Sequence, residues 1–130
     1  MSLGVPTDRR YLKSHEWHKL DGEICTIGIT KFAVEQLGDI TQVDLPKEGE
    51  SLKKDEVFGT VESVKAVSDL FAPLSGKVLK VNDPLKDSPE YVNDDCYDEG
   101  WMVEIELSVD AEKAALMSAK QYKEFLEESA

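Results

Sequence analysis

The chain has 130 residues, of which 41% are apolar and 32% charged, and 27 acidic residues against 15 Lys and Arg give a formal net charge of -12. This length suits a single domain over residues 1–130, whose core needs no metal or disulfide. No apolar run approaches the roughly 20 residues of a membrane helix, so we expect a soluble protein. The negative charge disfavours nucleic-acid binding, because it repels phosphate backbones.

Candidate metal ligands are scarce in the sequence. Cys25 and Cys96 form no CxxC pair, and His15 and His18 lack the HExxH spacing that places both rings on one helical face. We therefore predict two free thiols and no metal site. The N-terminus has neither an apolar signal core nor an Arg- and Ser-rich stretch. These features predict a cytoplasmic bacterial protein; a mature organellar chain with the same features would instead lie in the mitochondrial matrix.

The first half of the chain predicts a hairpin, a short helix and a further strand. Residues 11–29 alternate loosely and are interrupted by the turn signal Asp21-Gly22, and the β-branched run at 24–29 predicts a buried strand. Thr30 can cap a short helix that ends at Gly38. We expect inward-facing side chains on this helix and on the following strand at 39–45, before a turn at 46–49: Phe32, Val34, Leu37, Ile40, Val43 and Leu45.

The second half predicts more strands and a final helix. Residues 51–81 have the pattern of short strands with turns between them, one at 72–76. Residues 83–99 hold seven acids, one lysine and two prolines, and predict an exposed loop. A strand at 101–107 should place Trp101, Val103, Ile105 and Leu107 on one face. The segment 110–128 predicts a helix with Asp110 as its cap, Glu112 in its first turn and a stripe of Ala115, Ala119, Tyr122 and Leu126.

Lys65 is the strongest candidate for chemistry. It lies between Val64 and Ala66, an apolar context that is unusual for a solvated lysine, and polar residues frame this short stretch. A lysine at the tip of a tight hairpin would be accessible to another enzyme while its strands stay fixed, which is what a swinging prosthetic arm needs. From spacing alone, however, a plain surface lysine at a strand end explains the same pattern.

The sequence around Lys65 resembles a lipoyl attachment hairpin, and the chain as a whole resembles the glycine cleavage H-protein family. The resemblance runs from about Tyr11 to the C-terminal helix. It departs at Cys96, where the family usually has proline, and at His18, where it usually has an aliphatic residue. The matching segments are Glu62-Ser63-Val64-Lys65-Ala66, Ser68-Asp69, Ala72-Pro73-Leu74-Ser75-Gly76-Lys77-Val78, Ser14-His15-Glu16-Trp17, Gly28-Ile29-Thr30, Leu37-Gly38-Asp39-Ile40, Val43-Asp44-Leu45-Pro46, Asn82, Asn93 and Gly100-Trp101.

The resemblance implies a mainly β fold, a flattened barrel-sandwich hybrid with a short internal helix, a C-terminal α-helix and a lipoyl-binding core at 24–106. It implies a carrier rather than an enzyme. Lipoate, covalently bound at Lys65, would take an aminomethyl group from the pyridoxal-phosphate glycine decarboxylase to the tetrahydrofolate-dependent aminomethyltransferase. Dihydrolipoamide dehydrogenase would reoxidise the dithiol, and a lipoate-attaching enzyme would recognise Glu62 and Gly76. We expect the carrier to be a monomer.

A further expectation follows from charge. The loaded arm would carry a cationic amine, and a carboxylate beside it would hold the arm against the surface and limit attack by water. Glu16 and Asp69, with Ser14, are the candidates in family-matching segments. The same two acids could instead be solvated side chains or backbone caps. The chemical idea requires the N-terminal segment to fold back beside the Lys65 hairpin.

Several alternatives share part of this pattern. An H-like carrier that relays lipoate to other proteins would need the same lysine. A lipoyl domain of a 2-oxoacid dehydrogenase is usually shorter and tethered by Pro- and Ala-rich linkers, which are absent here. A biotin carrier usually has methionine on both sides of its lysine, unlike Val64 and Ala66. An enzyme with Cys25 or Cys96 as nucleophile lacks a recognisable signature, and a purely scaffolding role is the remaining option.

Overall fold

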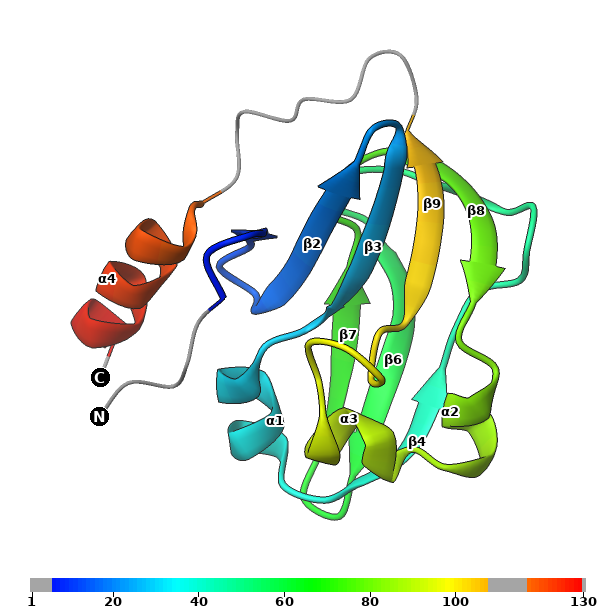
Figure 1. The fold of residues 1–130 in the computed structure, drawn as a ribbon. Coiled ribbons are helices and arrows are strands. Elements are labelled where there is room, and N and C mark those ends of the chain that lie inside the picture. Colours follow the sequence, from blue (N-terminus) through cyan, green and yellow to red (C-terminus); the bar gives the residue numbers. More distant parts are fainter. Residues whose placement is uncertain (1–5, 108–116, 130) are drawn as a thin grey trace.

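The computed structural model describes residues 6–107 and 117–129, which form a mainly β molecule with a helix at its C-terminal end (Figure 1). The strands and helices follow in this order: β1 (Arg10–Tyr11), β2 (Glu16–Asp21), β3 (Ile24–Ile29), α1 (Lys31–Leu37), β4 (Ile40–Asp44), β5 (Ser51–Leu52), β6 (Val57–Ser63), β7 (Val67–Phe71), β8 (Gly76–Val81), α2 (Pro84–Asp87), α3 (Glu90–Asp94), β9 (Val103–Leu107) and α4 (Ala119–Ser129).

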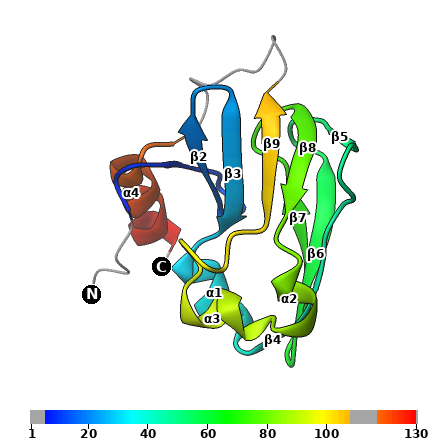
Figure 2. The same ribbon diagram turned by 45° about the vertical axis from the view of Figure 1, so that its right-hand side comes forward.

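Two antiparallel sheets face each other and enclose the main core. One has six strands in the order β1-β2-β3-β9-β8-β5, and the other has three in the order β4-β6-β7. The three-stranded sheet lies behind the larger one in Figure 1, and the turned view in Figure 2 separates them. Within the described residues the sheets do not close into a barrel. The predicted fold class, mainly β with two packed sheets, short helices and a C-terminal helix, is confirmed.

The N-terminal hairpin and the first helix form as the sequence predicts. Strands β2 and β3 pair antiparallel across the Asp21-Gly22 turn, where Gly22 has a φ of 62°. Helix α1 follows with the side chain of Thr30 accepting a hydrogen bond from the backbone N–H of Ala33. It ends at Gly38, whose φ of 80° favours glycine over other residues.

A β-bulge explains an irregular spacing on strand β4. Ile40 and Val43 are both buried although they lie three positions apart, which regular alternation does not allow. The pairing register between β4 and β6 shifts between Ile40 and Gln42, and this extra residue returns Val43 to the inner face. The predicted inward positions of Ile40 and Val43 are therefore confirmed, and Leu45 is half-buried against the same core.

The acidic segment at 83–99 is not the exposed loop that its composition predicts. It forms the short helices α2 and α3, and Leu85, Val92 and Cys96 are buried in the main core. Pro84 suits the first position of a helix, where its missing N–H costs nothing. The prediction was wrong because seven acids on the outer side masked a sparse apolar set on the inner side. These helices lie against β4, at the lower end of the molecule in Figure 1.

Two further details correct the sequence analysis. Val103, Ile105 and Leu107 share the buried face of β9 as predicted, but Trp101 precedes the strand and packs in a second cluster. Gly76, predicted in a turn, is the first residue of β8.

The C-terminal helix α4 lies beside the β1–β2 edge of the six-stranded sheet (Figures 1 and 2). Ala119 and Tyr122 are buried there with Tyr11 and Trp17, and the rings of Tyr11 and Tyr122 stack with centroids 4.7 Å apart. The helix begins at Ala119, later than predicted. Ser118 and Gln121 form a capping box, each side chain accepting a hydrogen bond from the backbone N–H of the other. Asp110, Glu112 and Ala115 lie outside the described residues.

Candidate functional site

Lys65 lies at the tip of the β6–β7 hairpin, at the lower end of the molecule in Figure 1. Glu62 pairs with Val67 in the last register position of the hairpin, and the backbone N–H of Ser63 donates to Ala66 O at 2.8 Å. These bonds leave Val64 and Lys65 as a two-residue loop. Lys65 is exposed, and no described residue forms an ion pair with it.

A serine hydroxyl braces this loop. Two-residue hairpin loops usually require positive φ angles, yet neither Val64 nor Lys65 has one. Instead, Ser63 Oγ accepts hydrogen bonds from the backbone N–H groups of Lys65 and Ala66, at 3.2 and 3.1 Å. The amides at the tip are thus satisfied locally, as in other serine turns. The lysine side chain can move while its backbone stays fixed.

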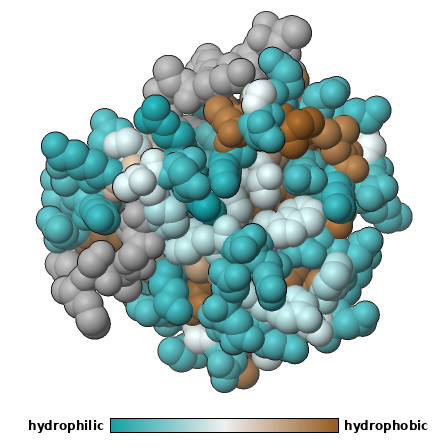
Figure 3. Space-filling view, in the orientation of Figure 1, coloured by the Kyte–Doolittle hydropathy of each residue, from teal (hydrophilic) through white to brown (hydrophobic). Residues whose placement is uncertain are grey.

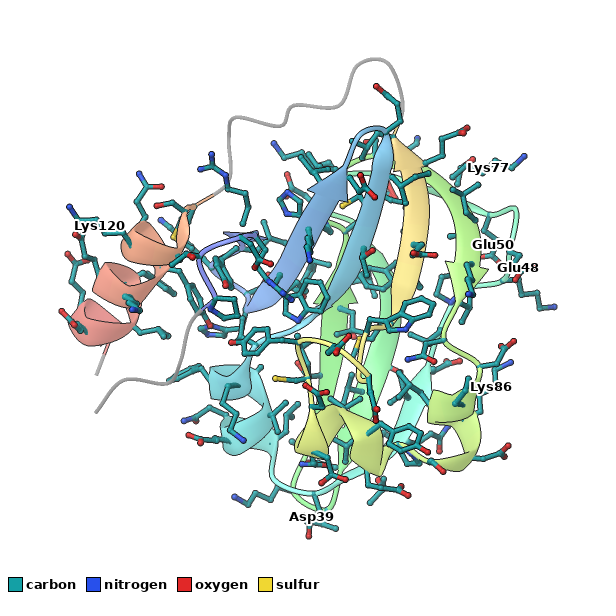
Figure 4. All side chains as sticks on the ribbon, in the orientation of Figure 1. Asp39, Glu48, Glu50, Lys77, Lys86 and Lys120 are labelled. Atoms are coloured by element: carbon teal, nitrogen blue, oxygen red, sulfur yellow. The ribbon has the colours of Figure 1, made fainter. Side chains whose placement is uncertain are left out.

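The segment that follows α1 contacts the tip and holds its backbone in place. The backbone N–H of Val64 donates to Asp39 O, and the Asp39 side chain is directed away from the domain in Figure 4. Lys65 lies across Gly38, where a Cβ would be 3.4 Å from Lys65 Cε. Asn93 clamps this segment, donating from Nδ2 to Gly38 O and accepting at Oδ1 from the backbone N–H of Ile40, both at 2.9 Å.

Two valines beside Lys65 are unusually exposed. Val64 is 71% exposed and Val67 61% exposed, and both are β-branched residues that would ordinarily be buried in a strand. The face of the molecule in Figure 3 is mostly hydrophilic, but brown surface reaches its lowest tip, where Figure 1 places the hairpin. Exposed apolar side chains around an accessible amine are suited to contact with a second protein or with an acyl chain.

Glu16 lies at the other end of β7. It is only 1% exposed, and its carboxylate accepts hydrogen bonds from the Ser14 hydroxyl and, at 2.7 Å, from the backbone N–H of Phe71. Burial raises the pKa of Glu16, while these two donors act in the opposite direction. The N-terminal segment therefore contacts the hairpin at the end of β7 that lies away from Lys65. Contact between these residues and a loaded arm stays a prediction.

A groove opens beside this buried carboxylate. It has a volume of about 500 Å³, and Ser14 and Phe71, the two partners of Glu16, are among its lining residues. Lys54 and Asp55 line it from the side of the hairpin, and Met117 lines it from the segment before α4. The Glu16 carboxylate is thus held by partners whose side chains line the groove.

The other predicted site residues are distributed over both sheets. Glu62 is half-buried on β6, and Asp69 is exposed on β7 between Lys65 and Phe71. Gly76 is buried in the larger sheet, where a Cβ would be 2.5 Å from Glu106 O. Close backbone approach therefore accounts for this glycine. Its part in recognition by a lipoate-attaching enzyme stays a prediction.

Both cysteines are buried and free, which confirms the prediction of two free thiols. Burial raises the pKa of Cys25 to about 12 and that of Cys96 to about 11. Thiols with such pKa values are almost entirely protonated at neutral pH and are poor nucleophiles. This argues against a cysteine-dependent enzyme. Cys96 also contributes its carbonyl oxygen, which accepts a hydrogen bond from Trp17 Nε1.

Within residues 6–107 and 117–129, no group of three or more His, Cys, Asp and Glu side chains is arranged to hold a metal ion. None of the helices in this part of the chain combines the length and apolarity required to cross a bilayer.

Comparison with known proteins matches this geometry to one family. The family model described as glycine cleavage H-protein matches residues 9–129. The chain belongs to this family. The glycine cleavage system H protein of Anaeromyxobacter sp. (strain K) is 55% identical over 97% of this chain and 98% of its own length. The corresponding protein of Staphylococcus epidermidis is 48% identical over 97% of this chain and the whole of its own length.

A solved structure extends the agreement to three dimensions. The crystal structure of a glycine cleavage system H protein from Mycobacterium marinum superposes with a TM-score of 0.84 at 37% identity. It covers 96% of this chain and 98% of that one. The family match thus spans both sheets and α4, and is not confined to the hairpin that other lipoyl domains would share.

The sequence did not indicate the supporting roles of Gly38 and Asn93. Gly38 was interpreted as the end of a helix and as part of a family-matching segment, and Asn93 only as part of the resemblance. Their positions beside the hairpin depend on the register between β4 and β6 and on the packing of α3, which the sequence does not specify. A weak signal was present, since a lone asparagine in an acidic segment offers both a donor and an acceptor.

Proposed function

We propose that this chain is the lipoyl carrier of a glycine cleavage system, with lipoate attached through an amide bond to Nζ of Lys65. The observation that carries the assignment is the placement of Lys65 in a member of the H-protein family: its amine is exposed at the braced tip of a hairpin and forms no ion pair with a described residue. A fixed base with a single mobile side chain is the geometry that a swinging arm requires.

The residues around the tip fit an acyl group on the amine. Acylation removes the lysine charge, and no described carboxylate would lose an ion-pair partner. Val64 and Val67 would then offer apolar contacts to the hydrocarbon part of the arm. When bound, the lipoyl group supplies reversible disulfide and dithiol chemistry at its own sulfur atoms. The chain's contribution is to present the arm and to hold its base still.

The partners follow from that role. A pyridoxal-phosphate glycine decarboxylase would load an aminomethyl group, a tetrahydrofolate-dependent aminomethyltransferase would receive it, and dihydrolipoamide dehydrogenase would restore the disulfide. The lipoate-attaching enzyme would meet the hairpin tip, where Glu62 lies at the last pair of the stem. In this system the chain would act as a carrier subunit, and its two cysteines are buried rather than presented as nucleophiles.

Asp69, Glu16 and Ser14 are proposed to receive the cationic end of the loaded arm. Asp69 follows Lys65 by four residues, a span of roughly 13 Å along an extended strand. A lysine that carries an extended acyl chain is of comparable length. Asp69 is exposed and would meet the amine first, while Ser14 lines the groove and the buried Glu16 carboxylate adds negative charge behind it.

Mass spectrometry tests the attachment site directly. The chain would be incubated with lipoate, ATP and a lipoate ligase, and digested for peptide mapping. We expect a single lipoyl adduct on Lys65, no adduct on Lys65→Arg, and an unchanged yield on Lys77→Arg, which alters another exposed strand-end lysine. Modification of a different lysine, or undiminished modification of Lys65→Arg, would overturn the assignment.

The role of the carboxylates has its own test. Loaded Asp69→Asn and Glu16→Gln carriers should release ammonia and formaldehyde faster than the wild type, although both accept lipoate normally. Glu48→Gln is the matched control, because it removes an exposed acid from the turn before β5, away from the hairpin tip and the groove (Figure 4). If all three variants keep the cargo as long as the wild type, these residues do not protect it.

A further inference from the structure

A polar cavity of about 340 Å³ lies at the edge of the six-stranded sheet, on β1 and β2 rather than on the lipoyl hairpin. Its lining includes His18 from β2, Arg10 from β1, Thr7 from the segment before β1, and Ser118 from the residue before α4. Arg10 and His18 are register partners in the antiparallel pair, which places their side chains on the same face. None of these four residues has a part in the carrier role described above.

His18 is the unusual member of the cavity. His18 is buried, with only 1% of the residue exposed. Neither of its ring nitrogens has a hydrogen-bond partner among the described residues. Buried polar groups are normally paired, because an unpaired one keeps the cost of its lost hydration. A buried imidazole that lines a cavity and has no internal partner indicates that the cavity receives a ligand with hydrogen-bonding groups.

The charged residues around the cavity determine whether it favours an anion or a cation. The Arg10 side chain forms no hydrogen bond or ion pair with any described residue, whereas Arg9 is already occupied by Asp8 and by the carbonyl oxygen of Tyr97. The one acid on the lining, Asp8, is neutralised by Arg9 at 2.9 Å and Lys19 at 3.3 Å. The free charge in the cavity is therefore positive, in spite of the net charge of -12 on the whole chain.

The N-terminus of α4 adds to this field. Ser118 stands at the start of this 11-residue helix, whose first turn contains no acidic residue. The partial positive charge of a helix N-terminus favours anions. Because Ser118 Oγ serves as the acceptor for the Gln121 amide, its hydroxyl hydrogen remains available to donate.

We propose that His18, Arg10, Thr7 and Ser118 form a binding site for a small oxyanion of the phosphate class. The Arg10 guanidinium meets the charge, and the hydroxyls of Thr7 and Ser118 donate. Both ring nitrogens of His18 are covered by the surrounding protein, so its ring turns towards the bound anion for one N–H to complete the set. A cation is disfavoured by the two arginines that line the cavity, and an apolar ligand would leave His18 unpaired. This site is independent of lipoylation and lies on a different sheet edge from Lys65.

Inorganic phosphate is the probe, and NMR of the histidine rings in the full chain is the measurement. We expect a saturable change of the His18 resonances as phosphate is added at constant ionic strength, while the other histidine, His15, which is not on the cavity lining, responds much less. Chloride at the same ionic strength should have no such effect. A shift that grows without saturation, or that chloride reproduces, would overturn the proposal.

Two variants assign the binding to these residues. Arg10→Gln, an exposed substitution that should not disturb folding, is expected to weaken phosphate binding at least about tenfold, because a charge-assisted hydrogen bond is lost. Lys77→Gln makes the same charge change on β8, away from the cavity (Figure 4), and should bind as the wild type does. Phosphate should raise the melting temperature of the wild type, because it binds the folded chain, and should not raise that of His18→Leu. Equal binding by Arg10→Gln and the wild type would contradict the site.

Discussion

The two ends of the β6–β7 hairpin differ in how they hold a charged side chain: it is exposed and mobile at the tip, and buried and hydrogen-bonded at the opposite end, which we call the base of the hairpin. At the tip, Lys65 is exposed, and only the loop backbone is fixed: the Lys65 amide donates to Ser63 Oγ and the Val64 amide to Asp39 O. At the other end, Glu16 is 1% exposed and holds the Phe71 amide through its side chain. The tip therefore presents a group whose loss should affect function alone, whereas the base contains a group whose loss should affect folding. This separation allows an arm to swing without loosening the domain.

The largest expected effect is at the tip. Lys65→Arg should abolish lipoylation and carrier activity, because a guanidinium cannot form the amide with lipoate, while the free energy of unfolding should change by less than about 0.5 kcal/mol. Urea unfolding of the variant, together with its intact mass after treatment with ligase, measures both quantities. A loss of stability comparable to that of a core substitution would mean that the tip is not separate from the fold.

Sequence reasoning predicted locally encoded elements better than contacts between distant segments. The strand at 24–29, the Thr30 cap and the stop at Gly38 depend on local signals, and all are present as expected. The burial of Leu85 and Val92 was missed, since the acids around them dominate the composition. Glu16 was placed near the hairpin, but its bond to the Phe71 amide was not foreseen. That bond depends on the packing of one sheet on the other, which no local pattern encodes.

His18, a second buried polar side chain, should make the stability of the protein depend on pH. Burial lowers the pKa of His18 from 6.5 to about 4, with Arg10 as a second cause. The unfolded chain therefore binds the proton more readily than the folded one, so stability is lost as the pH falls from about 6.5 towards 4. Relative to His18→Leu, the wild type should lose about 3 kcal/mol by pH 4.

Urea unfolding of both proteins between pH 7.5 and 4 measures this difference, in buffers free of phosphate. Arg10→Gln supplies the second comparison, because removing the nearby positive charge should make the loss slightly smaller. Parallel stability curves for the wild type and His18→Leu would show that the imidazole is not constrained in the folded state.

Two carboxylate variants compare the stability contribution of the buried acid at the base of the hairpin with that of an exposed acid on its surface. Glu16→Ala leaves the Phe71 amide unpaired and should lower the free energy of unfolding by about 2 kcal/mol. Asp69→Ala removes an exposed acid from the same hairpin and should change it by less than about 0.5 kcal/mol. Thermal or urea unfolding at pH 7 decides between them. Equal effects of the two substitutions would remove the distinction between base and surface.

The smallest expected effect concerns the support beneath the tip. Asn93→Ala removes the bonds to Gly38 O and from the Ile40 amide, and should cost about 1 kcal/mol, because water can replace part of this pairing. Asn93→Asp keeps the acceptor for Ile40 but places a carboxylate oxygen against Gly38 O, which repels it, so its cost at pH 7 should be at least that of the alanine variant. The same order is expected for the initial rate of lipoylation of Lys65, measured by mass spectrometry. If both variants were destabilised but lipoylated at the wild-type rate, the support would matter for folding alone, and Ser63 would be sufficient to hold the tip.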